Sequence, residues 1–240
     1  MPHVMVPFAN GKGGVGKTTL ACSYAVAQAV QGADVILADA NEAQQTALHW
    51  SQVRNHNDLL PKIRVESASA RQALEMAGRC EVLVVDTPGW TDKGTLALAK
   101  KSTFMVIPTG PNPTYELAPT VRLLHGLRAE GIEAWRVGVV LSRFSADAKP
   151  AHEEEQFARA YLAEAGYGAL DGCIRNSTAY SRALAEGYGL TEVIHARPLL
   201  EEASHVMASI AKAVTSADRR HQRLQAQLGG KTKDRGGREQ

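Results

Sequence analysis

Two lysines and four glycines lie close together near the start of the chain, in the segment GKGGVGKT from Gly11 to Thr18. The segment fits the pattern G-x-x-x-x-G-K-[ST], whose glycines let backbone N–H groups turn toward phosphate oxygens. In this pattern we expect Lys17 to neutralise the β- and γ-phosphates and the Thr18 hydroxyl to bind Mg²⁺. The residues expected to surround the nucleotide are Gly11, Lys12, Gly13, Gly14, Val15, Gly16, Lys17, Thr18 and Thr19.

A phosphate-binding loop needs one lysine, and Lys12 is a second one directly before two glycines. The run KGGVGKT, from Lys12 to Thr18, resembles the ParA/MinD family of deviant Walker ATPases, whose loop reads KGGxGK[ST]. The resemblance implies that Lys12 reaches the phosphates of ATP held by the other subunit of a nucleotide-sandwich homodimer, somewhat like an arginine finger. Lys12 would then couple ATP binding to dimerisation.

The resemblance covers the chain from Val4 to about Lys212. The run VLVVDTPG, from Val82 to Gly89, looks like the Walker B strand and switch II of the family. It implies that Asp86 holds Mg²⁺ together with Thr18, and that Gly89 lets the backbone move when the γ-phosphate leaves. VIPTGPNP (106–113) resembles the family segment that flanks the base and the dimer face, and RNSTAYSRALAEG (175–187) its late helix. Among members of the family, short plasmid-type ParA proteins and cargo-positioning relatives fit best.

The chain departs from the family at switch I, which usually reads D-x-D-P-Q and here reads DANEAQ, from Asp39 to Gln44. Asp39 matches the first aspartate, but Asn41 stands where the second would orient the attacking water. An amide can hold a water molecule but cannot accept its proton as a carboxylate can. Three outcomes stay open: slow ATP hydrolysis, an ATP-binding switch with almost no turnover, or a normal rate in which Glu42 supplies the missing charge. The candidate catalytic residues are Lys12, Lys17, Asp39 and Asn41.

A second departure concerns the base. Ser142 and Arg143 lie where relatives often place an asparagine that reads adenine, so adenine specificity is implied only by the resemblance.

The function that the resemblance implies is that of a partition or positioning ATPase. ATP–Mg²⁺ would drive dimerisation, the dimer would bind DNA nonspecifically, and a ParB-like or cargo adaptor protein would stimulate slow hydrolysis. Nonspecific DNA binding rests on contacts of Lys and Arg with phosphates. The candidate DNA-binding residues are Arg175, Arg182, Arg219, Arg220 and Arg223.

Other functions remain as alternatives. One is a regulatory switch that binds ATP with little hydrolysis, which Asn41 favours. Another is a MinD-like membrane-cycling ATPase, which needs a C-terminal amphipathic helix, whereas this chain offers only Leu224 and Leu228 before two glycines. A nitrogenase-reductase type of enzyme needs cysteines after the switch regions, and Cys22 and Cys80 do not fit that requirement.

Composition and charge agree with a nucleotide switch that works in the cytoplasm. The chain of 240 residues carries 27 Lys/Arg against 25 Asp/Glu, and 44% of its residues are hydrophobic. Residues 215–240 are basic, as expected of a segment that attracts nucleic acid. No apolar run approaches the ~20 residues that span a bilayer, and no signal peptide is recognisable. We expect a cytoplasmic, nucleoid-associated protein with no membrane partner.

These residues must be held by alternating strands and helices. The strands are continuous apolar runs, expected at 4–9, 34–38, 63–66, 81–86, 103–108, 136–141 and 170–174. Between them, helices are expected at 18–31, 42–54, 68–77, 92–101, 115–130, 151–165, 179–186 and 199–227. The alternation predicts an α/β fold of the P-loop NTPase type, a doubly wound, mostly parallel sheet with helices on both faces. We expect one ATPase domain over residues 1–214, the end of the last helix over 215–228 and a disordered basic tail over 229–240.

Overall fold

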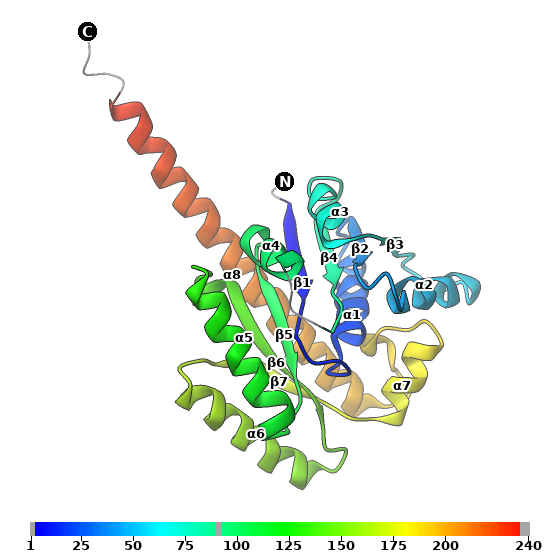
Figure 1. Cartoon of the computed structure of the whole chain (residues 1–240). Coiled ribbons are helices and arrows are strands. Elements are labelled where there is room, and N and C mark those ends of the chain that lie inside the picture. The colour runs from blue at the N-terminus through cyan, green and yellow to red at the C-terminus, as the bar shows by residue number, and fades with distance from the viewer. Residues whose placement is uncertain (1–2, 90–92, 236–240) are drawn as a thin grey trace.

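The computed structural model describes residues 3–89 and 93–235 (Figure 1). Its centre is a single sheet of seven strands, all parallel, in the order β3-β2-β4-β1-β5-β6-β7. The strands are β1 (Val4–Phe8), β2 (Val35–Asp39), β3 (Arg64–Ser67), β4 (Val82–Asp86), β5 (Met105–Thr109), β6 (Val137–Phe144) and β7 (Ala169–Arg175). The predicted strands are all present, within three residues at each end. The five central strands are mostly buried, as suits a sheet that is covered on both faces, whereas the outermost strands β3 and β7 are only partly buried.

Helices cover both faces of this sheet. They are α1 (Lys17–Val30), α2 (Thr46–His56), α3 (Ala70–Glu75), α4 (Lys93–Lys101), α5 (Ala118–Ala129), α6 (Ala148–Glu164), α7 (Thr178–Ala185) and α8 (Arg197–Arg235). One core cluster packs α1, α2, α7 and α8 against one face, and two further clusters pack α3, α4, α5 and α6 against the other. The predicted doubly wound α/β architecture is therefore confirmed.

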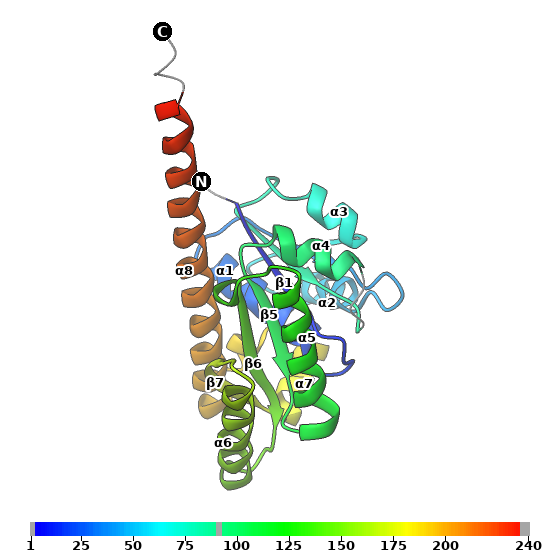
Figure 2. The same ribbon diagram turned by 60° about the vertical axis from the view of Figure 1, so that its left-hand side comes forward.

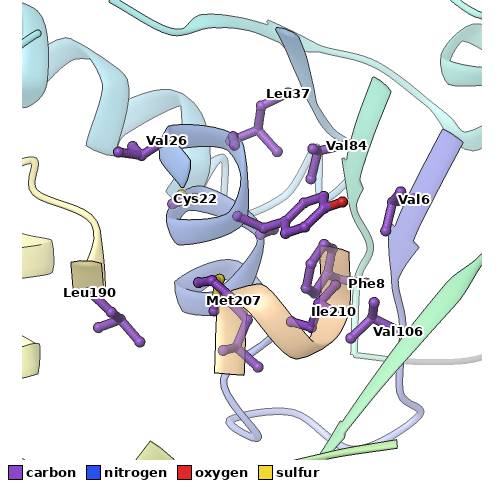
Figure 3. Packing of buried hydrophobic residues seen from close by; sticks show 14 of the residues in the cluster. Val6, Phe8, Cys22, Val26, Leu37, Val84, Val106, Leu190, Met207 and Ile210 are labelled. Carbon is purple, nitrogen blue, oxygen red and sulfur yellow. The ribbon is translucent and has the colours of Figure 1, made fainter. Parts of the chain in front are cut away.

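The larger core cluster lies between the sheet and helix α1 (Figure 3). Phe8 at the end of β1 meets Tyr24 of α1 with ring centroids 5.8 Å apart. Met207 and Ile210 of α8 belong to the same cluster and cover the same face of the sheet as α1. This packing fixes the strand β1 and the helix α1, and the glycine-rich loop connects the two.

The carboxyl ends of the strands meet at one edge of the sheet, where the order of the strands reverses around β1. Phe8, Asp39 and Asp86 are paired neighbours at that edge. In open parallel sheets ligands bind in the crevice outside the carboxyl ends, at this switch point.

Helix α2 begins at Thr46, four residues after the predicted start at Glu42. The backbone N–H groups of Gln44 and Gln45 donate to the carbonyl of Asn41, and Gln45 takes a left-handed conformation with φ 48°. These bonds form a turn that occupies the residues expected to be the first helical turn.

Helix α8 also differs from its prediction, because it continues to Arg235 (Figure 2). Residues 229–235 were expected to be disordered and are helical, whereas residues 236–240 lie outside the described residues. Gly229 and Gly230 each cost a helix only about 1 kcal/mol, and cations near its C-terminus favour it. Among the described residues, no helix is long and apolar enough to span a bilayer.

Candidate nucleotide-binding site

A cavity of about 710 Å³ opens at the carboxyl edge of the sheet, in front of α1. It brings together the P-loop (residues 11–18), the switch I loop (residues 39–45), switch II (residues 86–89) and the start of α7. Gly14 and Gly16 have φ values of 76° and 91°, a region that favours glycine. A Cβ atom on Gly16 would lie 2.7 Å from Ser142 Oγ, so glycine is required there for a second reason.

The start of the P-loop is held by Asn10, which the sequence analysis did not single out. Its Nδ2 donates to the carbonyl of Pro108 (2.7 Å) and to Thr120 Oγ1 (2.9 Å). Its Oδ1 accepts the backbone N–H of Lys12 (2.9 Å). A fully bonded, buried amide therefore fixes the loop to β5 and α5.

The two lysines of the loop point to different places. Lys17 is buried, lines the cavity, and donates from Nζ to the carbonyl of Lys12 (3.0 Å). Burial lowers the pKa of Lys17, and the nearby Asp86 partly opposes this. Lys12 is exposed and is not among the residues that line the cavity of its own chain.

Thr18 and Asp86 form the acidic side of the site. The Thr18 hydroxyl donates to Asp86 Oδ2 at 2.6 Å, and the carboxylate is buried. Asp86 Oδ1 is also buried and has no hydrogen-bond partner among the described residues. Burial raises the pKa of Asp86 to about 7, and Asp39 adds to this, while Thr18 and Lys17 oppose it. A buried carboxylate oxygen beside a hydroxyl fits a hard divalent cation such as Mg²⁺, which would satisfy Oδ1 and favour the ionised form.

Switch II packs directly on the P-loop. A Cβ atom on Gly89 would lie 3.2 Å from the Cα of Gly13 and 3.8 Å from Lys17 Nζ. Thr87 donates from its hydroxyl to the carbonyl of Phe8 at 2.9 Å. The absence of a side chain at Gly89 thus allows the two loops to touch beside Lys17.

Asp39 organises switch I through backbone groups. One carboxylate oxygen accepts the N–H of Asn41 (3.1 Å) and the other accepts the N–H of Leu48 (3.0 Å) in the first turn of α2. Asn41 and Gln44 line the nucleotide cavity, and Asn41 Nδ2 donates to Gln44 Oε1 at 2.9 Å. Glu42 lines an adjoining cavity of about 310 Å³, which also has Ser69 of the β3–α3 connection in its wall and shares Asn41 with the first cavity; Glu42 itself does not line the first cavity.

Another part of the cavity wall comes from β6, β7, α7 and the turn after α7. Arg143 has φ 65°, unusual for a residue other than glycine, and its guanidinium donates to the carbonyl of Gly14. The rest of this wall is made of Ser142, Ile174, Arg175, Asn176, Ser177, Tyr180, Ser181, Leu184 and Leu190. The segment 175–187 was expected to resemble the late helix of the family, with Arg175 and Arg182 as candidates for DNA contact, and its place at this cavity was not predicted. Its lining residues are spaced along a strand, a turn and a helix, which gives no compact sequence pattern.

The five arginines predicted to bind DNA are placed in three ways. Arg175 donates from Nε to Glu202 at 2.5 Å and lines the nucleotide cavity, so its charge is already neutralised. Arg182 is exposed on α7. Arg219, Arg220 and Arg223 are exposed on α8, and the Arg220 guanidinium lies 4.9 Å from the ring centroid of Trp135.

Comparisons with known proteins identify the family of the chain. Residues 6–190 match the family described as CobQ/CobB/MinD/ParA nucleotide binding domain. The chain is 31% identical over 189 residues to maintenance of carboxysome distribution protein A of Gloeobacter kilaueensis, covering 78% of this chain and 84% of that one.

Two solved structures share the fold. One is the septum site-determining protein MinD of Pyrococcus horikoshii in complex with Mg-ADP, with TM-score 0.69, 14% identity, and coverage of 90% of this chain and 98% of that one. The other is a ParA family ATPase of Chlorobium tepidum, with TM-score 0.65, 15% identity, and coverage of 83% and 96%. The chain belongs to the CobQ/CobB/MinD/ParA family of nucleotide-binding domains.

Proposed function

We propose that this protein is an ATPase that switches between ATP- and ADP-bound states in order to position a cargo or partition DNA. ATP–Mg²⁺ binding drives formation of a nucleotide-sandwich homodimer, the dimer binds DNA without sequence preference, and an adaptor protein stimulates slow hydrolysis. The related carboxysome distribution protein supports a positioning role.

The observation that carries the proposal is the Thr18–Asp86 pair beside the buried Lys17. Thr18 Oγ1 lies 2.6 Å from Asp86 Oδ2. The other carboxylate oxygen of Asp86, Oδ1, is buried and has no hydrogen-bond partner among the described residues. Thr18 and Asp86 would hold Mg²⁺, directly or through water, and the ion would neutralise charge on the β- and γ-phosphates. The N–H groups of the P-loop and the N-terminus of α1 would hold the phosphates.

The exposed Lys12 supports a dimeric active state. Its backbone is fixed by Asn10 and Lys17, but its side chain is exposed and outside the lining of its own cavity. A cation held at the rim of a phosphate site can reach nucleotide in a facing subunit. Lys12 would then stabilise the dimer only when the partner subunit carries a nucleoside triphosphate.

Helix α8 supports DNA binding. Lys212, Arg219 and Arg223 follow one another at i, i+7 and i+11 and therefore share one face of the helix. They line a shallow hollow together with Thr215, Ser216 and Arg220. Such a stripe of cations can contact successive phosphates without reading bases.

A second candidate function is a regulatory switch that binds ATP and hydrolyses almost none of it. The observation that favours it is the pair of amides, Asn41 and Gln44, at the place in the cavity where a carboxylate would accept a proton from water.

The first experiment measures binding of random-sequence duplex DNA by the full chain with ATP–Mg²⁺, with ADP–Mg²⁺ and without nucleotide. We expect salt-sensitive binding with ATP–Mg²⁺ alone, and loss of that binding in Lys12→Ala. The matched control is Lys101→Ala. This lysine ends α4 just before β5 begins, so it lies at the opposite edge of the sheet from the P-loop.

Equal DNA binding in all three nucleotide states would contradict the proposed switch, and an absence of DNA binding in every state would contradict the DNA-based mechanism. The affinity of Lys12→Ala for ATP is measured separately. An unchanged affinity shows that the variant has lost dimerisation, and a weaker affinity shows that it has lost nucleotide binding. Unchanged DNA binding in that variant would leave Lys12 without its proposed role.

A further inference from the structure

We propose that Asn41 and Gln44 together hold the attacking water, as an amide pair that takes the place of a carboxylate. The inference rests on the proposed ATPase function and names the residues that carry out its hydrolytic step. It differs from the expectation that Glu42 supplies the missing charge.

The first argument is the ordering of the pair. Asn41 Nδ2 donates to Gln44 Oε1 (2.9 Å), so each amide orients the other. Their backbones are joined as well, since the N–H of Gln44 donates to the carbonyl of Asn41 at 3.1 Å. Asp39 anchors this turn at both ends, through the N–H groups of Asn41 and Leu48. The two side chains are therefore positioned before any ligand binds.

The second argument concerns the polar atoms of the pair that take no part in the hydrogen bond between Asn41 and Gln44. Once Asn41 Nδ2 and Gln44 Oε1 are joined, the other polar atoms are an acceptor, Asn41 Oδ1, and a donor, Gln44 Nε2. Neither has a hydrogen-bond partner within the part of the chain that the structure describes. An acceptor and a donor on two linked amides suit a water molecule, which needs both. Both side chains line the cavity that contains Lys17 and Thr18.

The third argument concerns the neighbours in the same turn. Glu42 lines only the adjoining cavity, with Ser69 and Ala70, whereas Asn41 lines both cavities. Gln45 turns toward β3, where its Nε2 lies 3.4 Å from Ser67 Oγ. Of the polar side chains at positions 41–45, only Asn41 and Gln44 line the nucleotide cavity. The structure thus offers two matched controls within three residues of the proposed pair.

The step proceeds without a protein base. The oxygen of the held water forms a bond to the γ-phosphorus, and the bond between that phosphorus and the β–γ bridging oxygen breaks, leaving its electron pair on ADP. Because a neutral amide does not accept a proton, the proton of the water goes to a γ-phosphate oxygen, and the products are ADP and inorganic phosphate. The pair contributes by positioning the water, and misplacement of a reactant by about 1 Å can cost about 100-fold in rate.

The test measures kcat for ATP hydrolysis and, separately, the Kd for ATP, with the full chain and Mg²⁺. We expect Asn41→Ala and Gln44→Ala each to lower kcat by about 10- to 100-fold, with the Kd for ATP unchanged. The double variant should lose no more than the larger single loss, because both residues act on one water. Asn41→Asp restores a proton acceptor and should raise kcat above that of the wild type.

Glu42→Gln and Gln45→Ala serve as controls and should retain the wild-type kcat. Since Gln44 is exposed and Asn41 is only partly buried, their substitution is not expected to unfold the protein, and a thermal melt of each variant checks this. Wild-type kcat in Gln44→Ala, or a loss in Glu42→Gln as large as that in Asn41→Ala, would overturn the inference. A wild type that binds ATP without turnover overturns the proposed hydrolysis itself, so the two failures are distinguishable.

Discussion

The polar residues of the nucleotide pocket are of two kinds. Some have their polar atoms hydrogen-bonded within the protein, and others have an atom that a ligand could bind. Asn10 and Asp39 have their polar atoms bonded to backbone groups and shape the P-loop and switch I. Asp86 keeps one buried oxygen without a partner among the described residues. The first kind of residue determines where the loops lie, and the second kind determines what they bind.

The buried Asp86 makes stability depend on pH in the metal-free protein. Its pKa rises from 3.8 to about 7 on folding. Between these two pH values, the folded protein therefore holds a proton that the unfolded chain releases. The free energy of unfolding should therefore fall as the pH rises from about 4 to about 7. Asp86→Asn cannot titrate and should gain in Tm relative to the wild type across the same window.

This prediction is checked by thermal melts of both proteins in EDTA at several pH values, and the quantity to follow is the difference between the two Tm values. Other titrating groups are common to both proteins and cancel in that difference to a first approximation. A difference that stays constant between pH 4 and pH 8 would show that Asp86 is already ionised in the folded protein.

At the scale of elements, helix α2 joins switch I to the segment that leads out of α7. Arg54 of α2 is fully buried and donates twice to Glu192 (2.8 and 3.0 Å) and once each to the carbonyls of Gly187 and Pro61 (both 3.0 Å). Trp50 donates from Nε1 to the carbonyl of Tyr188 at 3.1 Å. A Cβ atom on Gly187 would lie 2.5 Å from the backbone nitrogen of Arg54, so the two segments touch directly.

Removing the Arg54 charge should be costly. Arg54→Met leaves Glu192, whose side chain is 19% exposed, without its partner and leaves two carbonyls without their donor. Breaking a buried pair in this way costs about 3–5 kcal/mol. Equilibrium urea unfolding should show a lower midpoint than that of the wild type, with a similar slope m.

The matched control for this prediction is Arg71→Met. Arg71 also pairs with a glutamate, Glu75, but the two side chains are 89% and 65% exposed, and such surface pairs contribute about 0–1 kcal/mol. A loss in Arg54→Met no larger than that in Arg71→Met would show that the buried pair contributes nothing beyond its packing.

The elements also show how far sequence reasoning reaches. The five central strands could be predicted because continuous apolar runs have few alternatives in a chain of alternating strands and helices, whereas the outermost strands β3 and β7 are partly polar. The start of α2 could not, because it depends on Asp39 accepting N–H groups from Asn41 and Leu48, contacts that form only when the strand and helix meet. The P-loop residues were predicted from their pattern, whereas Asn10 was missed because its partners are 98 and 110 residues away.

At the scale of the whole molecule, α8 is the feature that reaches beyond the α/β body (Figures 1 and 2). Its 39 residues would measure about 58 Å at 1.5 Å per residue. One face packs in the core through Ala203, Val206, Met207, Ile210, Val214 and Ala217. After Ala217, no side chain up to residue 227, where side-chain description ends, is buried. The same helix is thus a core element in its first half and a projecting, basic arm in its second.

This division predicts that the arm can be removed without loss of the fold. Deletion of residues 223–240 should leave the Tm nearly unchanged, because it removes no side chain known to be buried and keeps Arg220 and His221 on Trp135. The deletion removes five cations, so binding of duplex DNA in the ATP state should weaken. The slope of log K against log salt should become shallower by about 0.9 for each phosphate contact that is lost.

Two single substitutions separate charge on the arm from packing at its base. Arg219→Ala removes an exposed cation and should weaken DNA binding with no change in Tm. Arg220→Ala removes a guanidinium that lies over Trp135, and the lost contact should lower stability by about 0.5–1 kcal/mol. If the deletion and Arg219→Ala both left the affinity for DNA and its salt dependence unchanged, the basic face of α8 would not be the DNA-binding surface. Since Arg175 is paired with Glu202, Arg182 on α7 and Arg220 at the base of the arm would then be the exposed arginines left to test among those predicted from the sequence.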